Sequence, residues 1–191
     1  MAIALRTKTE LAGLRAANRL VAQTLDHLKS LVKPGATTRQ LSEAAEAFIV
    51  SNGGRCSFKG LYEPPFPGAI CTSVNGVIIH GTPDDVPLVE GDIVGLDVGV
   101  ELEGWYGDAA VTLPVGTVSD ENARLIEAAR SVLLDSIAKI RSGMRFKELS
   151  RILEEAITSR GYVPLRGYCG HGIGRKPHEE PSILNYVEGR P

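Results

Sequence analysis

The sequence predicts an α+β protein built from two related halves, each a pair of helices followed by short strands. Two observations support this. Apolar residues at helical spacing recur after about a hundred residues, and each helical region leads into short β-branched runs separated by turns. The 191 residues, 43% hydrophobic, are enough to bury one core. We expect a single domain over residues 1–191, with halves at about 1–116 and 117–191.

Two helices are predicted at the start of each half. Leu11–Leu31 has apolar residues at helical spacing, and Thr37 with Gln40 forms a capping box for a second helix that ends at about Ser51. In the second half, Ser119 caps a helix that runs to about Ile140, and another helix covers Phe146–Arg160.

The helical regions align with each other. Residues 32–54 and 140–162 share a glycine hinge and four pairs of similar residues: Leu41 with Leu149, Ser42 with Ser150, Glu46 with Glu154, and Ile49 with Ile157. Coincidence is the alternative, but the matched order of helix, hinge, helix and glycine stop favours a duplication.

Strands are predicted after each helix pair. In the first half they cover Ala69–Ser73, Gly76–Ile79, Asp92–Val100 and Trp105–Leu113, the last two joined by a turn at Glu103 and Gly104. In the second half only about thirty residues follow, and they end in a polar loop containing Gly and Pro. Symmetry predicts another hairpin beyond Pro191, so we expect the second half to be incomplete.

Composition excludes several classes of protein. A formal net charge of -2 and a pI near 6.1 offer no basic stripe for nucleic acid. Charged residues interrupt the first eleven positions, and no later apolar run reaches membrane-spanning length. Three distant cysteines, Cys56, Cys71 and Cys169, fit neither a disulfide framework nor a zinc knuckle. We expect a cytoplasmic protein that contacts neither membranes nor nucleic acid directly.

Two aspartates lie inside segments that are otherwise apolar, Asp97 in GDIVGLDVGV and Asp108 in GWYGDAAV. Burying a carboxylate without a partner is unfavourable, and no Lys or Arg lies nearby in this hairpin to pair with either residue. A bound metal ion would supply the missing positive charge. The alternative is that one aspartate caps a turn or accepts backbone hydrogen bonds.

Three of the four histidines, His80, His171 and His178, stand beside glycines or turns, whereas His27 lies on an amphipathic helix and is expected to be structural. The glycines of Gly170–Gly174 let the backbone approach a ligand closely. No Lys-Ser/Thr follows them, which argues against a nucleotide loop. Carboxylates and imidazoles without thiolates favour Mn, Fe, Co or Zn over a structural zinc site.

Six segments together resemble the type I methionine aminopeptidases of metallopeptidase family M24: KPGATTRQL, SFKGLY, ICTSVNGVIIHGTPDD, GDIVGLDVGV, GWYGDAAVT and YCGHGIGRKPHEEP. Their order and spacing match over almost the whole chain. The resemblance implies the pita-bread fold, in which two related α/β halves form a curved, mainly antiparallel sheet with helices on the outside. This agrees with the duplication.

The resemblance implies two divalent metal ions, of Co, Fe, Mn or Zn. Asp97 would chelate one ion, Asp108 would bridge both, and His171 would bind the other. In the family, two glutamates that follow the HEEP segment complete the site, on strands that would come after residue 191. We therefore expect weak metal binding and little or no activity from residues 1–191 alone.

The same resemblance implies roles near the substrate. His178 would donate a hydrogen bond to the scissile carbonyl, and His80 would lie near the amide nitrogen of the second residue. The metals would activate water, and the substrate's α-amino group would bind the ion held by Asp97. The methionine side chain would enter a pocket, edged by His178, of Cys56, Phe58, Tyr62, Phe66 and Cys71. Composition alone favours ordinary core packing for these five residues.

The implied function is removal of the N-terminal methionine from nascent polypeptides, near the ribosome, by a monomeric hydrolase. One alternative is an Xaa-Pro aminopeptidase or prolidase of the same fold, against which the short HGIG to HEEP distance and the SFKGLY segment argue. Another is a pita-bread protein that binds peptides without hydrolysing them. The joint presence of two aspartates and three histidines argues against that alternative.

Overall fold

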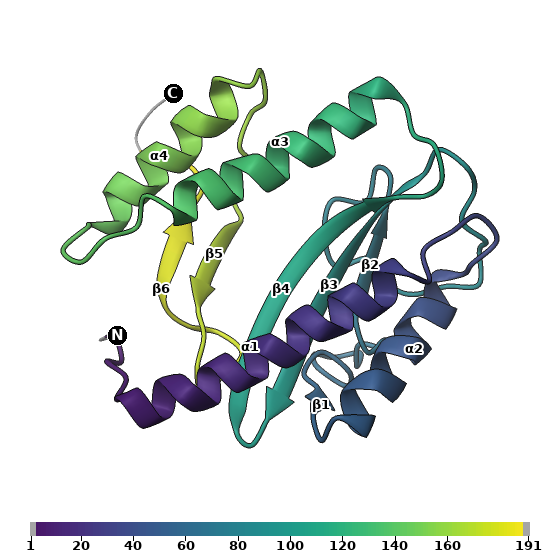
Figure 1. The fold of residues 1–191 in the computed structure, drawn as a ribbon, viewed down its shortest axis with the longest axis horizontal. Coiled ribbons are helices and arrows are strands. Elements are labelled where there is room, and N and C mark those ends of the chain that lie inside the picture. The colour runs from purple at the N-terminus through teal and green to yellow at the C-terminus, as the bar shows by residue number, and fades with distance from the viewer. Residues whose placement is uncertain (1–2, 189–191) are drawn as a thin grey trace. The chain divides into compact units, whose positions relative to one another are not determined.

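A computed structural model describes residues 3–188, which divide into two compact units (Figure 1). The N-terminal unit contains residues 4–122 and 173–177. The C-terminal unit contains residues 123–172 and 178–188, together with Ile3. No helix within residues 3–188 is both long enough and apolar enough to cross a membrane.

The N-terminal unit begins with helices α1 (Lys8–Lys29) and α2 (Thr38–Ser51). Both start at a capping box, in which a threonine side chain accepts a hydrogen bond from a backbone N–H one turn later and a Glu or Gln side chain bonds back. The box of Thr37 and Gln40 confirms the prediction. In α1 the cap is Thr7, so the helix begins three residues before the predicted Leu11.

Four antiparallel strands follow: β1 (Arg55–Cys56), β2 (Cys71–Val74), β3 (Ile93–Leu102) and β4 (Trp105–Pro114). The central strand β3 pairs with all three others. Glu103 and Gly104 join β3 to β4 with φ of 53° and 76°, as a two-residue hairpin turn requires. The predicted hairpin is confirmed.

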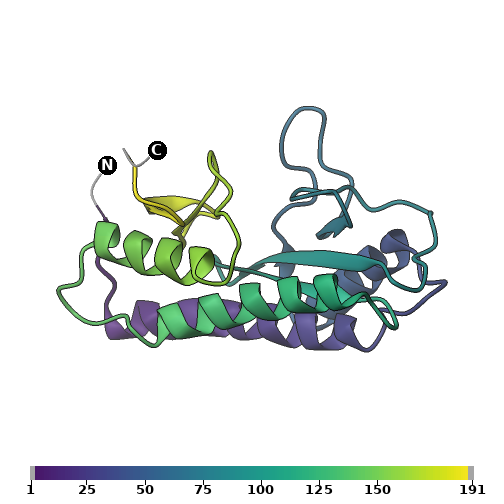
Figure 2. The same ribbon diagram turned by 90° about the horizontal axis from the view of Figure 1, so that it is seen from above.

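Side chains of β3 alternate between two faces, since successive residues of a strand point to opposite sides. Four of the residues at even-numbered positions are fully buried: Val94, Leu96, Val98 and Val100. They pack in one apolar cluster with Leu20 and Val21 of α1 and Ile49 of α2. Helices α1 and α2 thus cover this face of the sheet (Figure 2), which we call the helix face, and the odd-numbered residues occupy the opposite face.

Gly76–Ile79 does not form the predicted strand, and that prediction is wrong. The segment is a loop between Asn75 and His80, whose φ angles are 50° and 57°. Its β-branched residues are exposed, Ile78 to 67%. High β-propensity describes side chains that fit against neighbouring strands, and no strand within residues 3–188 pairs with this segment.

The C-terminal unit contains α3 (Asp120–Ile137), α4 (Phe146–Thr158), β5 (Cys169–Gly172) and β6 (Glu179–Leu184). The two strands pair antiparallel and lie over α4 (Figure 2). The predicted polar loop follows β6: residues 185–188 form neither helix nor strand, and the last three positions of the sequence lie outside the described residues. A small core joins Val132 of α3 to Leu149 and Leu153 of α4.

The residues aligned in the predicted repeat have similar surroundings in their own units. Leu41 of α2 and Leu149 of α4 are both buried, as are Ser42 and Ser150. In both units a helix pair precedes the strands. The duplication itself stays a prediction.

Candidate metal centre

Asp97 of β3 and Asp108 of β4 are diagonal neighbours on the face of the sheet opposite the helices, which we call the carboxylate face. Strand register pairs Asp97 with Ala110, and Gly99 with Asp108. Diagonal partners of this kind share a face, close enough for long or polar side chains to meet. The two carboxyl groups are in fact joined by a hydrogen bond. Both aspartates were predicted to lie on strands, and the register explains why their side chains meet.

The environment of the pair resists double ionisation. Burial raises the pKa of Asp97 to about 7, and the negative charge of Asp108 and the hydrogen bond to it act in the same direction. Two carboxyl groups this close share a proton because repulsion in a desolvated site penalises two charges. A divalent cation could replace that proton and stabilise both charges. The pair therefore fits a metal ion as part of its ligand set.

Cys71 lies directly opposite Asp97 in the β2–β3 register and is buried. Burial raises the pKa of the Cys71 thiol to about 12, and the charges of Asp97 and Asp108 act in the same direction. Cys71 is thus a neutral thiol at physiological pH. Its sulfur lines the carboxylate face as an apolar group rather than as a thiolate ligand.

Phe58 and Ser57 also lie on the carboxylate face. A Cβ atom added to Gly99 would overlap the Ser57 hydroxyl and the Phe58 ring. Gly99 pairs with Asp108, and its lack of a side chain leaves room for the Phe58 ring to lie against β3 at this position. Ser57 was not predicted as a site residue, although its position next to Phe58 in the SFKGLY segment could have indicated it.

The other predicted pocket residues are distributed differently. Cys56 pairs with Val100 and packs against the apolar cluster on the helix face, away from Asp97. Burial raises the pKa of its thiol to about 11. Tyr62 is 73% exposed, with φ of 71°. Phe66 is half-buried, and its backbone N–H donates to the Leu61 carbonyl at 2.7 Å.

His80 is an exposed residue of the N-terminal unit, held in a left-handed backbone conformation. The next residue, Gly81, fixes the loop to β2, because its carbonyl accepts a hydrogen bond from the Thr72 N–H at 2.8 Å. A Cβ atom at position 81 would overlap the Thr72 backbone. An uncommon conformation at a polar, exposed residue is typical of functional loops.

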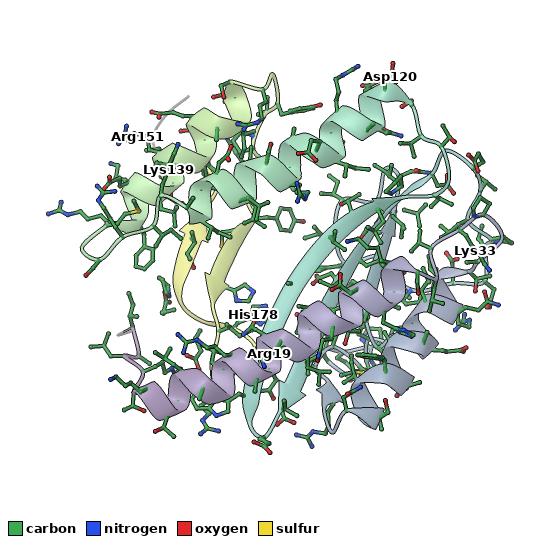
Figure 3. The ribbon with its side chains drawn as sticks, in the orientation of Figure 1. Arg19, Lys33, Asp120, Lys139, Arg151 and His178 are labelled. Atoms are coloured by element: carbon green, nitrogen blue, oxygen red, sulfur yellow. The ribbon has the colours of Figure 1, made fainter. Side chains whose placement is uncertain are left out.

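His171 and His178 meet in the C-terminal unit. His171 belongs to β5 and His178 immediately precedes β6 (Figure 3); their ring centroids lie 4.3 Å apart. Nδ1 of His171 lies 2.9 Å from the carbonyl oxygen of Gly172, which can only accept a hydrogen bond. This contact assigns the proton to Nδ1 and leaves Nε2 as the nitrogen that can bind a metal.

His27 has the structural surroundings expected from its position on a helix. Its ring stacks on Phe48 at 4.8 Å between centroids. Within residues 3–188, no group of three or more His, Cys, Asp or Glu side chains is arranged to hold a metal ion. The carboxylate pair and the imidazole pair each lie within one unit.

We expect replacement of Gly99 by alanine to lower the free energy of unfolding by about 1–3 kcal/mol, because the added methyl group overlaps Ser57 and Phe58. Urea unfolding would measure the change. Gly76→Ala is the matched control, because the space around Gly76 is open and the change should stay within about 0.5 kcal/mol. Equal effects of the two substitutions would contradict the close approach at Gly99.

Comparison with known proteins gives a consistent result. The model of metallopeptidase family M24 matches residues 12–191. A methionine aminopeptidase of Helicobacter pylori (strain J99) is 53% identical over 188 residues, which cover 98% of this chain and 74% of that protein. A methionine aminopeptidase of Clostridium perfringens is 40% identical, covering 99% of this chain and 74% of its own length.

Solved structures show the same fold. The crystal structure of methionine aminopeptidase from Rickettsia prowazekii superimposes with a TM-score of 0.93 at 38% identity, covering 98% of this chain and 75% of that one. An Xaa-Pro dipeptidase from Bacillus anthracis has a TM-score of 0.82 at 24% identity, covering 94% and 49%, and this likeness concerns the fold alone. The predicted pita-bread fold is confirmed.

The chain therefore belongs to the methionine aminopeptidases of metallopeptidase family M24. It spans about three-quarters of the length of the relatives described above. The identity to methionine aminopeptidases favours the interpretation of the sequence as a methionine aminopeptidase over the alternatives.

Proposed function

We propose that this protein removes the N-terminal methionine from polypeptides by metal-dependent hydrolysis of the first peptide bond. The observation that carries the proposal is the hydrogen-bonded pair Asp97 and Asp108, which shares one face of a hairpin and can exchange a proton for a cation. The names of the relatives support methionine as the residue removed.

We propose that Asp97, Asp108 and His171 would hold two divalent metal ions. Carboxylate and imidazole donors suit Mn, Fe, Co or Zn. The Nδ1–H of His171 is held by the Gly172 carbonyl, which orients the ring for ligation through Nε2. When bound, the ions would lower the pKa of water towards neutrality and polarise the scissile carbonyl.

His178 and His80 are proposed to contact the substrate rather than the metal. His178 would donate a hydrogen bond to the scissile carbonyl oxygen as negative charge develops there, and such a donor stabilises the transition state more than the ground state. The contact of His178 with His171 supports its place beside a ligand. His80 would bind near the amide nitrogen of the second residue, as the resemblance implies.

The methionine side chain is proposed to lie against Phe58 and Cys71. Both residues lie on the face of the sheet that carries Asp97. An aromatic ring and a neutral thiol are apolar and polarisable, which suits a thioether. Phe66 and Tyr62, on the loop that follows Phe58, stay predicted pocket residues, whereas Cys56 packs into the core and is left out of the proposed pocket.

The substrates proposed are nascent polypeptides met in the cytoplasm near the ribosome, with the enzyme acting as a monomer. The three cysteines are free, which suits a reducing compartment. The methionine aminopeptidase relatives support an N-terminal methionine as the group recognised.

The decisive experiment tests three peptides as substrates. The protein is expressed from its complete gene and loaded with Co²⁺ or Mn²⁺. Free methionine should be released from Met-Ala-Ser but not from N-acetyl-Met-Ala-Ser, because the free amine is expected to anchor the substrate. An Ala-Pro peptide should remain intact. Cleavage of the Ala-Pro peptide in preference to Met-Ala-Ser would overturn the proposal in favour of an Xaa-Pro peptidase, and binding without cleavage would favour a peptide-binding module.

A further inference from the structure

A cluster at the start of β4 has no part in the proposed chemistry. Trp105 is only 6% exposed, and the guanidinium carbon of Arg175 lies 3.8 Å from the centroid of its ring. A Cβ atom at Gly13 of α1 would overlap the indole, so the helix backbone lies close against the ring. Arg6 lies over the same ring system at 5.5 Å. Trp105 is thus a buried, closely packed surface on which Arg175 stacks.

Arg175 is fixed at its other end by hydrogen bonds. Its Nη1 donates to the carbonyl oxygen of Gly104 at 3.0 Å and is 3.4 Å from that of Glu103. Both carbonyls belong to the β3–β4 turn. Stacking and hydrogen bonding together use the plane and the edge of one guanidinium, a combination that an ammonium group cannot make.

The backbone beside Arg175 is attached to the same strand. The Tyr106 N–H donates to the Gly174 carbonyl at 2.8 Å, and Gly174 is buried. The segment Ile173–Pro177 belongs to the N-terminal unit for this reason, although the residues on either side of it belong to the other unit. Five residues are therefore held on the hairpin that carries the two aspartates.

The segment Ile173–Pro177 lies between the two histidines of the C-terminal unit, so its attachment affects both of them. Gly172 precedes it, and the Gly172 carbonyl orients His171. His178 follows Pro177 directly. Fixing the segment at Gly174 and Arg175 limits the conformations open to both histidines, because each is only three residues from a fixed point. Positions this close to a fixed point keep little backbone freedom.

We propose that Arg175 is a positioning residue, which holds the segment between His171 and His178 on the β3–β4 hairpin through Trp105 and the turn carbonyls. It touches neither substrate nor metal in this role. The inference rests on the proposed function for its effect on turnover, but its effect on the two imidazoles can be measured without any activity.

The primary test is histidine NMR of the metal-free protein, expressed from its complete gene. In Arg175→Gln the ring resonances of His171 and His178 should shift or broaden, since their mutual contact at 4.3 Å would loosen. The His27 resonance, set by stacking on Phe48, is the internal control and should stay in place. Arg175→Lys should give an intermediate result, because an ammonium can still reach one turn carbonyl.

Arg151→Gln is the matched control variant. Arg151 is an exposed residue of α4 (Figure 3), and its contact with Glu155 at 3.5 Å is a surface ion pair. Its substitution should leave the four histidine resonances unchanged. Unchanged His171 and His178 resonances in Arg175→Gln would overturn the proposal. A shift of His27 as large as theirs would overturn it too, because it would mark a general loss of structure.

Turnover gives a second, separable test. With Met-Ala-Ser, kcat of Arg175→Gln should fall about 10- to 100-fold, the usual range for groups that orient metal ligands, while KM changes little. A rise in KM at unchanged kcat would overturn the positioning role. If the unmodified protein does not cleave Met-Ala-Ser, the proposed function fails, and the NMR comparison still decides the role of Arg175.

Discussion

In the protein expressed from its complete gene, replacing Asp97 with asparagine will lower kcat/KM for Met-Ala-Ser by more than about 100-fold. This loss exceeds the usual effect of replacing a residue that only orients a metal ligand. The reason is loss of a charged ligand next to Asp108, which remains the only carboxylate of the pair. Asparagine has nearly the same shape, so the hairpin should persist. Calorimetric titration with Mn²⁺ or Co²⁺ should show a matching loss of affinity.

Asp26→Asn is a suitable control for the removal of one negative charge. Asp26 is on α1 with its side chain 80% exposed, and it forms an ion pair with Lys29 at 3.9 Å. That variant should bind metal and cleave peptide as the unmodified protein does. Retention of full metal affinity by Asp97→Asn would show that the carboxylate pair is not the metal site.

The metal-free protein will become less stable as pH rises from about 4 to 7. The pKa of Asp97 is raised from an ordinary 3.8 to about 7 in the folded state. Between these values the folded protein keeps a proton that the unfolded chain has lost, so the free energy of unfolding falls as pH rises. Below about pH 4 both states hold the proton, and above about 7 neither does. This difference between the folded and unfolded pKa of Asp97 corresponds to a loss of at most about 4 kcal/mol in the free energy of unfolding.

Urea unfolding in the presence of a chelator, at several pH values between about 4 and 8, would measure this slope. The difference between the unmodified protein and Asp97→Asn isolates the contribution of the pair from that of the histidines. The variant should have the flatter profile and be relatively more stable at the alkaline end. Added Mn²⁺ should restore stability at high pH in the unmodified protein only, because binding to the folded state shifts the equilibrium. Identical slopes for both proteins would contradict a shared proton.

Local sequence signals predicted the framework of the N-terminal unit well. The capping box of Thr37 and Gln40 begins α2, and the turn at Glu103 and Gly104 joins two strands close to their predicted bounds. The inference that Asp97 and Asp108 lie on neighbouring strands required only that turn. Their diagonal contact depends on register, which is specified by the alternation of buried residues in β3.

The strand and pocket predictions that differ from the structure have a common cause. Composition does not say which segments gain a neighbouring strand. Ile78 has a strand-forming side chain but lies in a loop with no paired strand. The glycine-rich segment around Gly170, for which no strand was predicted, gains a neighbouring strand and forms a hairpin. Cys56 and Ser57 are adjacent, so a single step along the chain decides which of them faces the core. The family resemblance placed the cysteine in the pocket, whereas its pairing with Val100 puts it on the helix face, where it packs as composition favoured.

The alternation of β3 has a consequence for how this protein can change during evolution. Leu96 and Asp97 are adjacent in the chain, yet one is constrained by packing against the helices and the other by its charge and its partner Asp108. A substitution at Leu96 would disturb the packing against the helices, whereas a substitution at Asp97 would change the charge of the carboxylate face. One ten-residue strand can therefore keep its packing while its other side is adapted to a different peptide.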